Sequence, residues 1–106
     1  MYYIYMIRCA DNSIYTGITT DLSRRFKEHS EKKISCAKYT MSHQATKIEA
    51  VWQAPDRQTA SRLEYYIKKL TKINKEKLIA DNQNLEKFFS EKLHLSDYER
   101  IVSCGF

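Results

Sequence analysis

The fold is decided near the amino terminus, where residues 2–18 read YYIYMIRCADNSIYTGI. Residues 2–9 form a near-continuous aromatic and aliphatic run, which is typical of a strand covered on both faces. Asp11, Asn12 and Ser13 follow as a turn cluster, because such side chains readily bond their own backbone. Residues 14–18 then resume a β-prone run. The pattern predicts a β-hairpin at the start of the chain.

Helical and extended patterns alternate along the remaining sequence. KIEAVWQ, at residues 47–53, predicts a third strand, and residues 34–46 are typical of a loop. Apolar residues recurring every three or four positions predict helices over residues 22–32, 57–70, 71–79 and 85–93. We therefore expect an α+β fold with a small three-stranded antiparallel sheet, flanking helices and an extra C-terminal helix. We expect residues 1–80 to form one domain, with residues 81–106 as a helical extension packed on or beside it.

Composition narrows the class of partner. The chain has 106 residues, which suits a single domain, and 18 Lys and Arg against 13 Asp and Glu. The resulting net charge of +5 favours an anionic partner, and the basic excess belongs entirely to residues 1–80. No apolar run approaches the ~18–20 residues that span a bilayer. The three cysteines are far apart, so we expect incidental thiols in a cytoplasmic protein without a membrane partner.

Five polar side chains fall where a purely apolar core would not need them: Tyr5, Tyr15, Arg25, His29 and Glu64. The two tyrosines lie on neighbouring strands of the predicted hairpin, and Arg25 and His29 lie one helical turn apart. Glu64 borders the apolar stripe of its helix, where an unpartnered carboxylate would be costly. Each residue alone also has a structural interpretation, such as an ion pair between Glu64 and Lys68 four positions later. Their joint spacing favours a site.

The spacing of these residues resembles a known family. Tyr3-Ile4-Tyr5 followed by Tyr15-Thr16-Gly17 resembles the paired signature of the GIY-YIG nucleases, and Arg25, His29 and Glu64 follow in the family's order. Residues 2–79, about three quarters of the chain, resemble the small stand-alone bacterial, YhbQ-like subgroup. Tyr3 replaces the first glycine of the signature and Thr16 replaces its second isoleucine, and neither change removes a proposed catalytic side chain.

The resemblance implies a metal-dependent endonuclease that hydrolyses phosphodiester bonds in DNA with one Mg²⁺ or Mn²⁺ ion. Glu64 would be the metal ligand, and Arg25 would stabilise charge on the scissile phosphate. Tyr5, Tyr15 and His29 would position or activate the nucleophilic water. The chemistry is consistent, because Mg²⁺ takes few protein carboxylates and guanidinium matches phosphate geometry. Asn74 is either a further family position or simply a residue at a helix start.

Basic residues beside these positions indicate nucleic-acid contacts: Lys68, Lys69 and Lys72, with Lys38 and an aromatic neighbour, Tyr39. Such groups give largely non-specific binding, and Tyr39 is suited to stack on an unpaired base. DNA that is duplex, branched or single-stranded is the expected partner, with repair or DNA processing as the expected setting. Alternatives are a solvated lysine face, a binding module with little or no catalysis, and a C-terminal helix that binds a protein. The sequence indicates no specific protein partner.

Overall fold

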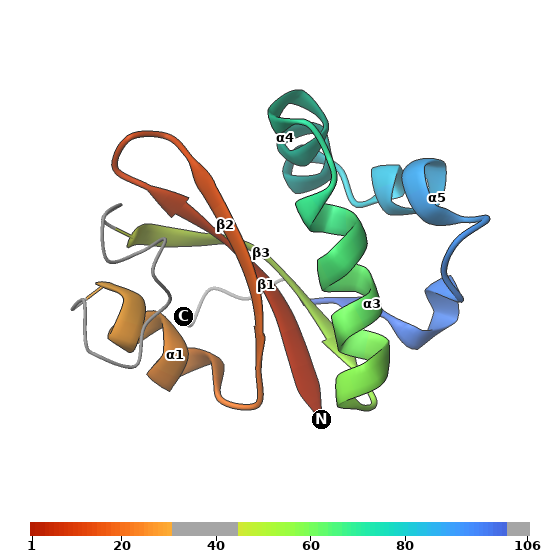
Figure 1. Cartoon of the computed structure of the whole chain (residues 1–106), viewed down its shortest axis with the longest axis horizontal. Helices are drawn as coiled ribbons and strands as arrows, with labels where there is room; N and C mark the ends of the chain where they lie inside the picture. The colour runs from red at the N-terminus through yellow and green to blue at the C-terminus, as the bar shows by residue number, and fades with distance from the viewer. Residues whose placement is uncertain (31–44, 102–106) are drawn as a thin grey trace.

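The computed structural model describes residues 1–30 and 45–101 and confirms the predicted α+β class (Figure 1). Within those residues it has one antiparallel sheet flanked by helices. The elements in chain order are β1 (Tyr2–Cys9), β2 (Ile14–Thr19), α1 (Leu22–Ser30), β3 (Ala45–Ala54), α3 (Arg57–Lys68), α4 (Lys72–Ala80), α5 (Gln83–Phe89), the 3₁₀ turn η1 (Leu95–Asp97) and β4 (Glu99–Arg100).

The sheet has the strand order β2-β1-β3-β4. β1 lies between β2, its partner in the predicted hairpin, and β3. Tyr5 therefore stands opposite Gly17 on one side and Val51 on the other. β4 extends the expected three-stranded sheet to four strands by pairing Arg100 with Trp52. Its two residues are too few to give a periodic signal, which is why the sequence did not predict it.

The alternation of β1 side chains divides the protein into two layers. Ile4 and Met6 point into the larger apolar cluster, together with residues of α3, α4 and α5. Tyr5 and Ile7 point the other way, into a smaller cluster that includes Leu22 of α1. Figure 1 shows this arrangement, with α1 on one side of the sheet and α3 to α5 on the other. Both faces of β1 are therefore covered, as its apolar run predicted.

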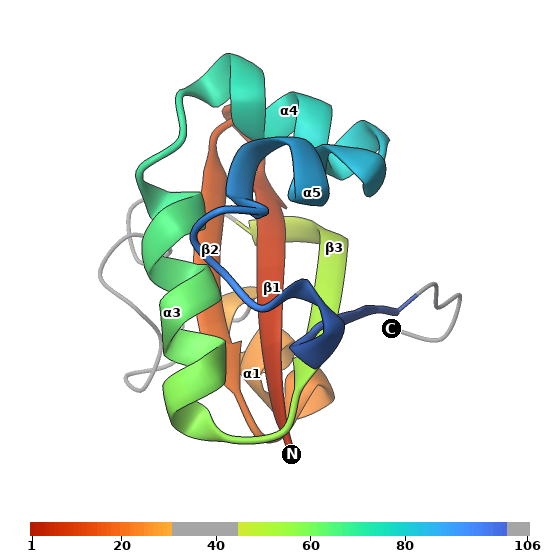
Figure 2. The same cartoon turned by 90° about the vertical axis from the view of Figure 1, so that its right-hand side faces the viewer.

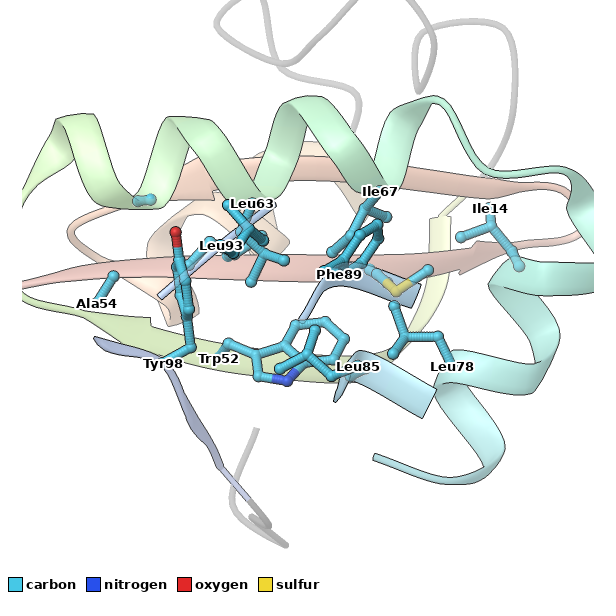
Figure 3. Packing of buried hydrophobic residues seen from close by; sticks show 14 residues of the cluster. Ile14, Trp52, Ala54, Leu63, Ile67, Leu78, Leu85, Phe89, Leu93 and Tyr98 are labelled. Carbon is cyan, nitrogen blue, oxygen red and sulfur yellow. The ribbon is translucent and has the colours of Figure 1, made fainter. Parts of the chain in front are cut away.

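The segment after residue 81 packs on the same core as α3. Figure 2 shows α5 and the chain that follows it beside α3. Figure 3 shows Leu85, Phe89 and Leu93 beside Trp52 in the larger cluster. Trp52 is fully buried, and its Nε1 donates a hydrogen bond of 2.8 Å to Oδ1 of Asn82.

Three further contacts attach this segment to the sheet and to α3. The Tyr98 hydroxyl donates a hydrogen bond of 2.7 Å to the backbone carbonyl of Thr59 at the start of α3. The Arg100 guanidinium lies 5.0 Å from the ring of Trp52, within the range of a cation–π interaction. The backbone N–H of Ile101 donates to the carbonyl of Val51 at 2.9 Å.

Capping side chains set the helix starts. Asp56 accepts a hydrogen bond from the backbone N–H of Thr59, and Thr71 accepts one from that of Asn74, as expected for N-caps. The ends differ slightly from the sequence expectations, since α3 stops at Lys68 and α5 spans residues 83–89. Leu93 is nevertheless buried, because a turn after α5 returns it to the core.

Arg8 links three elements on the face that carries α4. Its guanidinium donates to Glu49 on β3 at 2.9 Å and to Glu76 on α4 at 2.6 Å. It also donates to the carbonyl and to the side-chain oxygen of Asn12, both at 3.1 Å. Asn12 has a φ of 71°, a left-handed conformation that asparagine adopts more readily than most residues. The β1–β2 turn, β3 and α4 therefore meet at one side chain.

Among the helices formed by residues 1–30 and 45–101, none combines the length and apolar character that a bilayer crossing requires.

Candidate active site

Three of the predicted site residues form an aromatic cluster on the α1 side of the sheet. Gly17 is the partner of Tyr5 across the β1–β2 ladder, and Tyr15 lies two positions before Gly17, on the same face. α1 covers this face and contributes His29. The ring centroids of Tyr15 and His29 lie 5.2 Å apart, and those of Tyr5 and Tyr15 lie 6.3 Å apart. The hairpin register and the helix together bring these side chains into contact.

Tyr5 and His29 form a buried hydrogen-bonded pair. The Tyr5 hydroxyl lies 3.0 Å from Nε2 of His29, and both side chains are almost fully buried. Burial, assisted by the charge of Arg25, lowers the pKa of His29 to about 4. Burial and the neighbouring Tyr15 raise the pKa of Tyr5, although Arg25 opposes that shift. A neutral imidazole and a protonated phenol therefore face each other at neutral pH, and the imidazole nitrogen can accept the phenolic proton.

Gly17 makes room for Tyr5. A methyl group added at Gly17 would lie 2.5 Å from the Tyr5 hydroxyl, 2.7 Å from its Cζ and 3.2 Å from Cε2 of Tyr15. Those distances are shorter than van der Waals contact, so a side chain at position 17 would displace the buried Tyr5 ring from its place. This requirement explains why a glycine stands inside the second strand, opposite Tyr5.

Arg25 lies beside the pair and is partly buried. Its charge acts on the Tyr5 side chain, and its Nη1 lies 3.3 Å from the carboxylate of Glu28, one turn further along α1. Burial lowers the pKa of Arg25, but the interactions with Tyr5 and Glu28 outweigh it and the net shift is upward. The guanidinium therefore keeps its positive charge beside the buried tyrosine cluster, where it is partly exposed to solvent. Glu28 was not among the predicted site residues, since on α1 it is one of many charges without a distinctive spacing.

Glu64 approaches the cluster from the other helical layer. Its side chain is 22 % exposed, and its charge contributes to the raised pKa of Tyr5. Lys68, one turn later on α3, lies 3.4 Å from the Glu64 carboxylate and 5.8 Å from the ring centroid of Tyr15. The Glu64–Lys68 ion pair, which was the structural interpretation of Glu64 from the sequence, is therefore present. It lies next to the aromatic cluster.

The donor set suits a hard divalent cation. Glu64 offers accessible carboxylate oxygens, which Mg²⁺ and Mn²⁺ prefer. Residues 1–30 and 45–101 contain no group of three or more His, Cys, Asp or Glu side chains that would hold an ion by themselves. One carboxylate with water and phosphate oxygens is the type of site that Mg²⁺ accepts, because this ion keeps much of its hydration shell.

The predicted nucleic-acid contacts are less tightly grouped. Lys68 is at the site, whereas Lys69 lies over the ring of Tyr65 at 4.4 Å and Lys72 pairs with Glu76 at 3.5 Å. Lys38 and Tyr39 lie outside the described residues. The backbone N–H of Asn74 donates to the Thr71 cap, which places Asn74 in the first turn of α4, as expected of a helix-start residue.

Comparison with known proteins adds independent information. Residues 1–77 match the GIY-YIG catalytic domain. A UPF0213 protein from Fusobacterium nucleatum is 42 % identical over 99 residues, which cover 87 % of this chain and 97 % of the relative. The UPF0213 protein YhbQ from Salmonella typhimurium is 42 % identical over 89 residues, covering 84 % and 87 % of the two chains.

One solved structure is also similar. The solution NMR structure of a UPF0213 protein from Bacillus halodurans is 36 % identical, covers 88 % of this chain and 99 % of its own, and superposes with a TM-score of 0.49. The matched domain includes every element that carries Tyr5, Tyr15, Arg25, His29 or Glu64. With close relatives among UPF0213 proteins and a match across residues 1–77, this chain belongs to the GIY-YIG family.

Proposed function

We propose that this protein is an endonuclease that hydrolyses phosphodiester bonds in DNA with one bound Mg²⁺ or Mn²⁺ ion. The observation that carries the proposal is that Arg25 lies beside the Tyr5–His29 pair, while Lys68, which pairs with Glu64 at 3.4 Å, lies 5.8 Å from the ring centroid of Tyr15. A phenol, an imidazole, a guanidinium and a carboxylate suit phosphoryl transfer, where positioning and charge stabilisation dominate catalysis. DNA repair, or the processing of branched or single-stranded DNA, is the setting that we propose.

The Tyr5–His29 pair would handle the nucleophilic water. With its own proton on Nδ1, His29 accepts a hydrogen bond from the Tyr5 hydroxyl at Nε2. This hydrogen bond would orient a lone pair of the Tyr5 oxygen toward the nucleophilic water. As the water oxygen bonds to phosphorus, the P–O bond to one sugar oxygen breaks and that oxygen leaves, taking a proton from solvent. One proton of the attacking water passes to the Tyr5 oxygen while the phenolic proton passes to Nε2 of His29. Tyr15, 5.2 Å from the His29 ring, would hold that geometry and confine the water.

Arg25 and Glu64 would handle the charge. Arg25 would bind the scissile phosphate, because its charge lies beside the Tyr5 oxygen and its planar fork matches phosphate oxygens. Glu64 would hold the metal, which when bound polarises the phosphoryl group and lowers the pKa of coordinated water. Lys68, which pairs with Glu64 at 3.4 Å, would bind the phosphate backbone next to the scissile phosphate.

The direct test is a cleavage assay on duplex, single-stranded, flapped and four-way-junction DNA with Mg²⁺ or Mn²⁺. We expect Glu64→Gln and Arg25→Gln each to lower the cleavage rate by at least about 100-fold, the scale seen when one charge-stabilising group is removed. Glu86→Gln, an exposed carboxylate on α5, is the matched control and should retain activity. Cleavage by both site variants at the wild-type rate would refute the assignment.

A binding module without hydrolysis is the second candidate. The observation that favours it is the ion pair between Lys68 and Glu64, in which the ammonium takes the place next to the carboxylate that a metal ion would need. Such a protein would bind DNA equally well in EDTA and in Mg²⁺ and would cut none of the four substrates. Cleavage that depends on both a divalent ion and Glu64 decides against it.

A further inference from the structure

A groove on the outer face of α3 is not used by the proposed chemistry. It has a volume of about 530 Å³ and is lined by Gln58, Ser61, Arg62, Tyr65, Tyr66 and Lys92. Five of these residues belong to α3, and Lys92 comes from the turn after α5. The segment after residue 81 therefore builds one wall of the groove, and a chain ending at residue 80 would lack that wall.

The lining combines aromatic surface with positive charge. Tyr65 is 52 % exposed, which is unusual for a large aromatic side chain, and its ring meets that of Tyr66 edge-on at 5.2 Å. Lys92 lies 5.6 Å from the Tyr66 ring, and Arg62 adds a second cation. Within residues 1–30 and 45–101, no acidic side chain lines the groove. A ligand that fits this chemistry has a flat ring to stack and an anionic group to pair, as a nucleotide does.

The position of the groove relates it to Glu64. Ser61 lines the groove and lies one helical turn before Glu64, while Tyr65 is the next residue after Glu64. One turn of helix is about 5.4 Å, and successive nucleotides of a stacked strand rise about 3.4 Å. A strand bound at Glu64 therefore reaches the groove within a few nucleotides by passing over Ser61.

We propose that this groove, which we call the Tyr65 groove, binds an unpaired nucleotide of the strand that flanks the scissile phosphate. The base stacks on the half-exposed ring of Tyr65, either on the side away from Lys69 or in place of that ammonium, which lies 4.4 Å from the ring centroid. Arg62 and Lys92 pair with the phosphate of the same nucleotide. The inference rests on the proposed nuclease function and names the form of DNA that the site prefers. A base paired inside a duplex cannot present its face to Tyr65, so the groove selects DNA with a single-stranded segment next to the cut.

Fluorescence anisotropy of the full chain with a labelled single-stranded oligonucleotide and a matched duplex, both in EDTA, tests the groove without cleavage. Loss of one stacked base corresponds to about a 5- to 150-fold weaker affinity. We expect Tyr65→Leu to weaken single-strand binding at least fivefold and duplex binding less than twofold. Tyr65→Phe retains the ring and should bind like the wild type. Because Tyr65 is exposed, neither change should disturb folding.

Arg62→Gln should weaken single-strand binding and reduce the slope of log affinity against log salt by about one unit. Lys87→Gln removes an exposed cation on α5 outside the groove and is the control. The proposal is overturned if the wild type does not bind single strands, if Tyr65→Leu binds them normally, or if it loses duplex binding equally.

The outcomes also separate the groove from the nuclease proposal. Glu64-dependent cleavage together with normal single-strand binding by Tyr65→Leu would reject the groove and retain the nuclease. Weakened single-strand binding by Tyr65→Leu with no cleavage of any substrate would retain the groove and reject hydrolysis.

Discussion

The Tyr5 ring lies so close to Gly17 that a methyl group at that position would stand 2.5 Å from the tyrosine hydroxyl. The two residues are direct partners in the β1–β2 ladder, so neither strand can move without disturbing the other. The same hydroxyl is hydrogen-bonded to His29 at 3.0 Å. A backbone position on the edge of the sheet therefore fixes the geometry of the candidate active site.

Gly17→Ala should damage both stability and cleavage. Overpacking a buried site of this kind costs about 1–3 kcal/mol of unfolding free energy, and displacing Tyr5 would break its hydrogen bond to His29. Urea unfolding and the cleavage assay measure the two effects. In a Tyr5→Leu background the clashing hydroxyl and Cζ atoms are absent, so the same substitution should be less destabilising there. Equal destabilisation in both backgrounds would show that the Tyr5 contact is not the cause.

His29 makes stability depend on pH in a defined window. Its pKa falls from an ordinary 6.5 to about 4 in the folded protein, so the unfolded chain binds more protons between those values. The contribution of neutral His29 to the free energy of unfolding is fully present above pH 6.5. It is lost progressively as the pH falls toward 4, by about 3 kcal/mol in all. Unfolding free energies between pH 7 and 4.5 should decline for the wild type and decline less for His29→Gln. An equal slope for the two proteins would contradict a depressed His29 pKa.

Lys68 should compete with a divalent ion for Glu64. The ammonium lies 3.4 Å from the carboxylate, and an exposed pair of this kind is worth about 0.5–1 kcal/mol. Lys68→Met should therefore tighten Mn²⁺ binding in the absence of DNA by about two- to fivefold, as measured by electron paramagnetic resonance of free Mn²⁺. Lys72→Met is the matched control, because Lys72 pairs with Glu76 instead. Unchanged Mn²⁺ affinity in Lys68→Met would mean that the ion does not bind at Glu64.

Replacing Arg8 should lower the free energy of unfolding more than replacing an exposed arginine. It is 15 % exposed and bonds both Glu49 and Glu76, so Arg8→Gln would leave these carboxylates with the more exposed Lys47 and Lys72 as their cationic partners. We expect a loss of about 2–4 kcal/mol in urea unfolding at pH 7. Arg24→Gln removes an arginine that is 66 % exposed and 4.0 Å from its partner, and should cost less than about 1 kcal/mol. Similar losses for both variants would argue against the Arg8 network.

The local elements were accessible to sequence reasoning because their causes are local. The hairpin follows from two β-prone runs around a turn, and the caps at Asp56 and Thr71 follow from side-chain chemistry. The pairing of Tyr5 with Tyr15 follows from their places on neighbouring strands of the predicted hairpin. The contact of His29 with them depends on how α1 packs on the sheet, and only the family resemblance grouped these three residues.

The remaining features depend on contacts between distant segments. Arg8 meets Glu76 across 68 positions, and Lys92 completes a groove on α3 from beyond α5. No periodic pattern encodes either contact, since each is set by how whole helices pack on the sheet. The ion pair of Arg25 with Glu28 is local, but it is hidden among many charged pairs of the same spacing.

Trp52 gives the protein a built-in optical reporter. It is the chain's single tryptophan, fully buried, and its indole is bonded to Asn82 and stacked near Arg100. The wavelength of its emission maximum and its protection from collisional quenchers therefore show whether the segment after residue 81 is packed on the sheet. Because Lys92 belongs to that segment, one fluorescence spectrum can distinguish a variant that has lost the wall of the Tyr65 groove from one that has lost only a contact within it.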